Sequence, residues 1–130
     1  MMGNVEINQE FIRANEFDDI REDIEKVTSL NLFKTMVIFS GGAFRNCKKL
    51  EEVFFGLDIT RIGNGTFIGC DNLTDVWFAI TDEDKIIEIA EDAFDECKKE
   101  ITFHIFGSAI KNKHLTNYAK RHGFRVTGMM

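Results

Sequence analysis

The fold is decided by one stretch of the chain, Ile62-Gly63-Asn64-Gly65-Thr66-Phe67-Ile68-Gly69-Cys70-Asp71-Asn72-Leu73-Thr74-Asp75-Val76-Trp77-Phe78. Its pattern of small and apolar residues returns on both sides, where a phenylalanine is again followed three positions later by a cysteine. The phenylalanines are 23 and then 27 residues apart and the cysteines follow the same steps: Phe44, Phe67 and Phe94, with Cys47, Cys70 and Cys97. A recurring period of this length predicts a solenoid in which each repeat forms one coil.

Each repeat divides into three parts by local chemistry. Val76 and Phe78 alternate with polar or outward residues and therefore share the inner face of a short strand. A return segment then crosses to the other side of the coil. Gly63 and Gly65 permit a tight turn, which leads into a single helical turn over residues 66–70 whose phenylalanine and cysteine point inward. The polar insertion over residues 81–85 is expected to bulge as a loop at one edge.

The two ends of the array read as helical caps on a single domain, 1–130. Phe17, Ile20, Ile24 and Val27 recur at steps of three and four among acids, which predicts an amphipathic helical cap over residues 9–26. An extra, degenerate repeat begins near Ile24, and the repeats are expected over residues 27–105. The C-terminal cap, over residues 106–130, should contain a helix from an Asn112 cap to His122, ended by Gly123, and then a last strand.

The pattern Ile-Gly-x-x-Thr/Ala-Phe-x-x-Cys-x-x-Leu-x-x-Val-x-Phe resembles the BspA-type leucine-rich repeats of bacterial surface proteins and some parasitic protists. The closing residues 118–124 are similar to the helix-and-strand tail that ends such arrays, so that the likeness covers residues 27–126. Glu100 departs from it by standing at a leucine position. The resemblance implies an α/β leucine-rich-repeat solenoid, a right-handed superhelix of short parallel strands and single helical turns. It also implies protein binding, frequently in attachment to hosts or other cells, and no catalysis.

Composition excludes several classes of function. The 130 residues are 44% hydrophobic and carry a net charge of −6, with acids concentrated in residues 1–30 and only bases among the charged residues of 101–130. Nucleic-acid binding is not expected, because it usually needs a broad basic face. Membrane insertion is not expected, because no apolar run approaches about 20 residues. The sequence as given shows no secretory signal and favours the cytoplasm, whereas the resemblance implies a secreted or cell-surface location.

The cysteines and histidines do not form a recognisable chemical site. Because each cysteine occupies the same position of its repeat, we expect buried free thiols that fill the core, and no disulfide framework. Zinc usually requires close cysteine pairs, which these spacings do not provide, so that no metal or cofactor is predicted. The histidines His104, His114 and His122 lie on the strand face or in the terminal cap, away from the inward cysteines. No catalytic residue is assigned, and the chain is expected not to be an enzyme.

The outward strand positions provide the candidate binding surface. Stacked coils should bring equivalent positions side by side at about 4.8 Å, which forms two columns on the sheet face. The residues of this candidate partner-binding site are Glu52, Phe54, Asp75, Trp77 and His104. Three neighbouring rings in this position suit a binding hot spot, and the acids beside them suit a basic partner. The alternative is that the rings pack on one another or on a cap helix and only stabilise the sheet.

Three functions remain open from the sequence. The favoured one is a non-enzymatic module that binds another protein through the exposed face of its stacked strands, centred on Trp77, where the neighbouring acids suit a basic partner. A second is an acidic cytoplasmic inhibitor or immunity-type protein, suggested by the net charge. The third is a structural spacer fragment of a larger adhesin.

Overall fold

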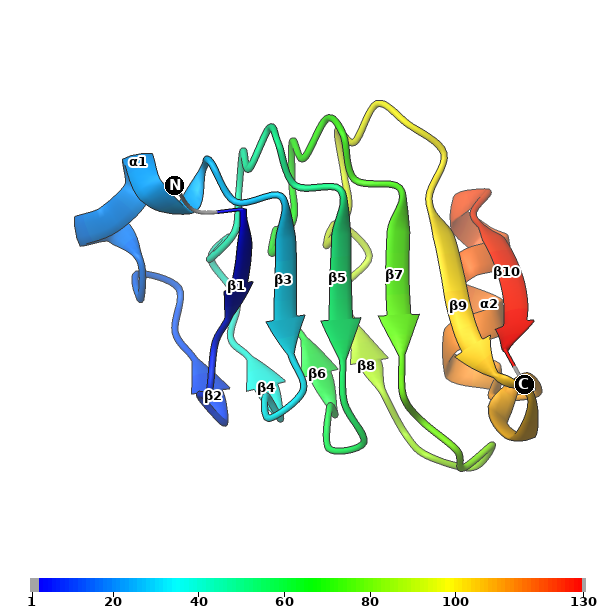
Figure 1. Ribbon diagram of the computed structural model, residues 1–130. Coiled ribbons are helices and arrows are strands. Elements are labelled where there is room, and N and C mark those ends of the chain that lie inside the picture. The colour runs from blue at the N-terminus through cyan, green and yellow to red at the C-terminus, as the bar shows by residue number, and fades with distance from the viewer. Residues whose placement is uncertain (1–2, 130) are drawn as a thin grey trace.

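Two parallel sheets run along the molecule, as the computed structural model of residues 3–129 shows (Figure 1). The large sheet consists, in spatial order, of β1 (Asn4–Glu6), β3 (Ser29–Leu32), β5 (Glu52–Phe55), β7 (Asp75–Phe78), β9 (Thr102–Phe106) and β10 (Arg125–Met129). The small sheet consists of β2 (Phe11–Ile12), β4 (Val37–Ile38), β6 (Arg61–Ile62) and β8 (Glu88–Ile89). From β1 to β9 the chain visits the two sheets alternately, which is the coiling that the repeat predicted, and β10 then joins the large sheet beside β9.

Equivalent residues of successive coils pair directly. Phe54 on β5 is in register with Trp77 on β7, and Trp77 is in register with His104 on β9. Inside the coil the rings of Phe44, Phe67 and Phe94 stack in one column, with centroid distances of 5.6 Å and 5.3 Å. The predicted stacking of repeats along a common axis is therefore confirmed.

The glycine turn before Phe67 exists because two coils approach closely there. A Cβ atom on Gly63 would lie 2.6 Å from the backbone carbon of Phe39 in the preceding coil, closer than a real contact allows. Gly65 adopts a φ of 65°, a left-handed conformation that costs glycine little. This pair of glycines lets the chain turn inward and bury Phe67 completely.

The N-terminal region differs from the helix expected over residues 9–26. It forms β1 and β2, and its helical part is limited to the 3-10 turn η1 (Asp18–Ile20) and the single turn α1 (Arg21–Ile24). Phe17 stacks on Phe44 at 5.2 Å and thus occupies the ring position of one more coil. The backbone N–H and C=O groups of β2 bond to β4 instead of bonding within a helix, and β1, which precedes the expected helix, bonds to β3.

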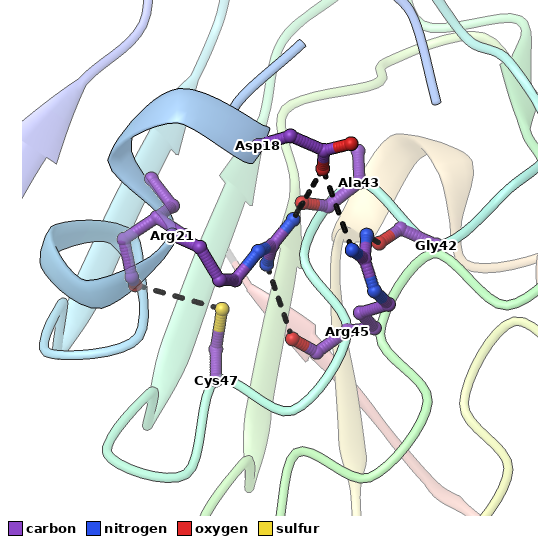
Figure 2. A network of polar contacts seen from close by, with 7 residues as sticks. Asp18, Arg21, Gly42, Ala43, Arg45 and Cys47 are labelled. Atoms are coloured by element: carbon purple, nitrogen blue, oxygen red, sulfur yellow. Dashed lines mark hydrogen bonds and ion pairs between the residues drawn. The ribbon is translucent and has the colours of Figure 1, made fainter. Parts of the chain in front are cut away.

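Arg21 supplies side-chain hydrogen bonds at the N-terminal end of the column of helical turns (Figure 2). In later coils, carbonyls of the helical turns accept backbone N–H groups from the preceding coil: Phe44 N to Thr66 O at 3.0 Å and Asn46 N to Ile68 O at 2.8 Å. The equivalent carbonyls of the second coil, on Ala43 and Arg45, accept instead from the two Nη atoms of Arg21, at 3.0 Å and 3.3 Å. One guanidinium thus replaces two backbone donors.

The C-terminal end agrees with the expectation. The helix α2 (Lys113–His122) begins after Asn112, whose Oδ1 accepts from the backbone N–H groups of His114 and Leu115, and ends at Gly123 with a φ of 72°. Asn112 is fully buried, and its Nδ2 also donates to the carbonyls of Asp82 and Lys85. It therefore ties the polar insertion loop to the terminal helix. The 3-10 turn η2 (Gly107–Ala109) connects β9 to this region.

Candidate functional site

The five candidate residues lie together on the outward face of the large sheet. They belong to three adjacent strands, β5, β7 and β9, and each is half-buried: Glu52, Phe54, Asp75, Trp77 and His104. The strand register places Glu52 beside Asp75 and Phe54 beside Trp77. The structure thus assembles the two columns that the alternation of the strands predicts.

The rings of the second column form a continuous stack. Phe54 and Trp77 lie 5.7 Å apart with an interplanar angle of 16°, and Trp77 and His104 lie 3.9 Å apart at 13°. The indole Nε1 of Trp77 is buried and has no hydrogen-bond partner within residues 3–129. Each ring therefore covers much of its neighbour, so that the C-terminal part of the column stabilises the sheet.

A hollow opens where this stack stops. It has a volume of about 490 Å³ and lies over β1, β3 and β5. Its lining combines apolar side chains, carboxylates and small polar groups: Asn4, Val5, Glu6, Ser29, Asn31, Phe33, Glu52 and Phe54. The column position on β3 carries Asn31, a small side chain in place of a ring, and this leaves the space open.

Phe33 is part of this surface although the strand alternation did not indicate it. It follows the last residue of β3, is 47% exposed and meets Phe54 edge-on at 6.2 Å. Its backbone N–H donates to Oδ1 of Asn31 at 3.0 Å, which fixes the turn in which it sits. The available signal was an apolar residue directly after a strand, at a position where a turn normally carries a polar one.

Asp75, His104 and Thr127 form a hydrogen-bonded series across the C-terminal end of the face. Nε2 of His104 lies 2.7 Å from Oδ1 of Asp75, and Nδ1 lies 2.8 Å from Oγ1 of Thr127 on β10. A carboxylate, an imidazole and a hydroxyl in series resemble a hydrolase triad, but the roles of the ring nitrogens are reversed and the imidazole is stacked flat on Trp77. We interpret the series as a link that holds β10 against β9.

The cysteines form a second column, inside the coil. Each thiol donates to a carbonyl of the preceding coil: Cys47 to Ile24 at 3.5 Å, Cys70 to Phe44 at 3.3 Å and Cys97 to Phe67 at 3.3 Å. All three are free thiols, as expected, and Cys47 and Cys70 are buried, but the expected burial of Cys97 is wrong because its side chain is only half-buried. Burial raises the pKa of Cys97 to about 11, and the hydrogen bond to Cys47 together with burial raises the pKa of Cys70. The thiols of Cys70 and Cys97 therefore stay protonated, whereas the hydrogen bond with Cys70 lowers the pKa of Cys47.

Within residues 3–129, no group of three or more His, Cys, Asp or Glu side chains is placed to hold a metal ion. None of the helices in that range is long and apolar enough to span a bilayer.

Comparison with known proteins agrees with the coils seen here. The family described as the BspA type leucine-rich repeat region matches residues 7–119, in six copies. No curated protein and no solved structure matches the chain. The matched region begins at Ile7, ahead of the extent that the repeat pattern alone indicated, and includes β2 and Phe17. Because the match spans most of the 130 residues, the chain belongs to the BspA-type leucine-rich repeat family.

Proposed function

We propose that this chain binds another protein through the outward face of its large sheet, at the hollow beside Phe54. A leucine-rich repeat module is generally a protein-interaction repeat and typically non-catalytic. The face joins exposed aromatic area to carboxylates, which is the composition of a binding surface that anchors a partner through ring contacts. Attachment to other cells is one setting in which such binding would serve.

The observation that carries the proposal is the half-exposed ring pair at the hollow. Phe33 is 47% exposed and Phe54 is half-buried, and both border a space of about 490 Å³. A side chain of a partner placed there would remove apolar surface from water without displacing any core residue. Trp77, which the sequence analysis took as the centre of the site, does not line this space, and its ring stacks on Phe54 from the side of β7.

A selection from a phage-displayed library of random nonapeptides tests the proposal directly. We expect enriched peptides to bind the wild-type chain and to lose about tenfold or more in affinity for the Phe33→Ser variant. The matched control is Phe39→Ser, which removes a ring of similar exposure, 42%, beside the small sheet. Both variants should keep the far-ultraviolet circular dichroism and melting midpoint of the wild type.

Two outcomes would contradict the proposal. Peptides that lose affinity with Phe39→Ser and not with Phe33→Ser would place the binding surface on the small sheet. A selection that enriches no peptide would favour the structural-spacer alternative. The inhibitor alternative uses the same acidic face and differs in its partner, a folded basic protein, so that added salt should then weaken binding steeply.

A further inference from the structure

We propose that the hollow beside Phe54 receives an arginine side chain of the partner, held by the carboxylates of Glu6 and Glu52 and stacked on the Phe54 ring. This inference rests on the proposed function and deepens it by naming the residue that the surface recognises. Three features of the hollow carry it: an available ring face, uncompensated negative charge and an adjoining apolar site.

The first feature is the orientation of Phe54. One face of its ring is stacked on Trp77 at 5.7 Å, and Phe33 meets the ring edge-on, at 65°. The next position of the column carries Asn31, whose Oδ1 is held by the N–H of Phe33. Because Trp77 covers Phe54 on the side of β7, the ring surface that Phe54 contributes to the hollow lies on the side of β3, where a flat group can stack. A planar guanidinium can lie flat on such a ring face, whereas a lysine ammonium contacts it only as a compact point charge.

The second feature is the charge of the lining. Glu6 is exposed on β1 and Glu52 is half-buried on β5, and both line the hollow. Neither forms an ion pair with another residue of the range 3–129, and the lining of the hollow contains no lysine or arginine. An arginine brings charge and up to five N–H donors to these oxygens in a fixed geometry.

The third feature is a second, apolar hollow on the other side of Phe33. It has a volume of about 290 Å³ and is lined by Phe33, Gly56, Leu57, Asp58 and Ala79. Leu57 is 57% exposed there. Phe33 borders both hollows. An extended peptide advances about 3.3 Å per residue, so that a partner with an arginine beside Phe54 can place an apolar side chain from a nearby position over Leu57.

The test uses three pools of capped nonapeptides that differ only in a fixed central residue: arginine, lysine or citrulline. Citrulline keeps the planar shape of arginine and removes the charge. Trp77 is the only tryptophan and contacts Phe54, so that its fluorescence reports occupancy when tryptophan is left out of the pools. We expect the arginine pool to bind about tenfold more tightly than the citrulline pool and about threefold more tightly than the lysine pool.

Variants of the chain locate the effect. Glu52→Gln should remove most of the preference for arginine over citrulline, and Phe54→Leu should remove the preference for arginine over lysine. The control is Glu88→Gln, which removes an exposed carboxylate from β8 on the small sheet and should change neither preference.

The outcomes separate this inference from the proposed function. Equal binding of the arginine and citrulline pools, or an unchanged preference in Glu52→Gln, would overturn the arginine assignment. If binding is then still lost in Phe33→Ser, the sheet face remains the binding surface and only the named residue is wrong. Binding that ignores Phe33→Ser would contradict both.

Discussion

Replacing Arg21 tests how the solenoid ends. Its guanidinium takes the place of two backbone donors, because the carbonyls of Ala43 and Arg45 correspond to those of Thr66 and Ile68, which accept N–H groups from the preceding coil. Arg21→Met keeps a long apolar stem and removes all donors. The two carbonyl oxygens would then lie partly buried without a hydrogen-bond donor, and the N-terminal end of the solenoid would be less stable.

The expected loss follows from these contacts. A buried carbonyl left without a hydrogen-bond donor costs about 1–3 kcal/mol of stability, and Arg21→Met leaves two carbonyls in this state. Part of the cost is offset, because Nε of Arg21 is itself buried without a partner within residues 3–129, so that its removal relieves an existing penalty. The net loss should be about 2–4 kcal/mol. For a chain of this size this corresponds to a fall of about 6–12 °C in the melting midpoint.

The assay is urea and thermal unfolding followed by circular dichroism, with Arg45→Met as the matched control. Arg45 lies in the same cluster and donates to Gly42 of its own turn and to Asp18 (Figure 2), and its side chain is 37% exposed. Its loss should cost less than about 1 kcal/mol. Arg21→Lys should fall between the two, since an ammonium reaches one carbonyl. Equal stabilities of Arg21→Met and Arg45→Met would refute the reasoning.

Three further predictions concern the core and the C-terminal end. Asn112→Asp should lower the free energy of unfolding in urea by about 2–4 kcal/mol, because a buried carboxylate would face the carbonyl oxygens of Asp82 and Lys85. Aspartate caps a helix as well as asparagine does, so that lost capping cannot account for this effect. A stability close to that of the wild type would contradict the prediction. Phe67→Ala should cost about 3–5 kcal/mol, because its fully buried ring touches the rings above and below it, and retention of the wild-type midpoint would contradict the stacked column. Burial raises the pKa of the Cys97 thiol from 9.0 to about 11, so that the thiol loses its proton at lower pH in the unfolded chain than in the folded one. The free energy of unfolding should therefore fall as the pH rises from 9.0 to about 11. In the Cys97→Ala variant this fall should be smaller.

The N-terminal coil shows why a correct repeat pattern can still miss an element. The next strand of the large sheet begins 12 residues after Phe17, whereas it begins 8 residues after Phe44 and 8 residues after Phe67. The four extra residues form the turn of α1, and their helical spacing masked the coil in the sequence. Pairing with β3 and β4 then outweighed that local preference. Arg21 could not be assigned from sequence, because its acceptors lie 22 and 24 residues away.

The binding face was predictable in its columns and not in its shape. The alternation of residues places Phe54 and Trp77 outward, and the repeat period places them side by side. The hollow depends instead on Asn31, which interrupts the rings, and on Phe33, which reaches in from a turn outside the alternating pattern. A turn side chain takes its direction from local hydrogen bonds that the repeat does not specify.

The face also keeps its register where the repeat length changes, which bears on how such a surface can vary. Phe54 and Trp77 are 23 residues apart and Trp77 and His104 are 27, yet both pairs are aligned. The extra residues fall between β7 and β8, where residues 81–84 are exposed and Asn112 holds the loop through two carbonyls. Length changes are thus absorbed at the edge, so that substitutions on the face can alter the partner while the inner rings still fix the stacking.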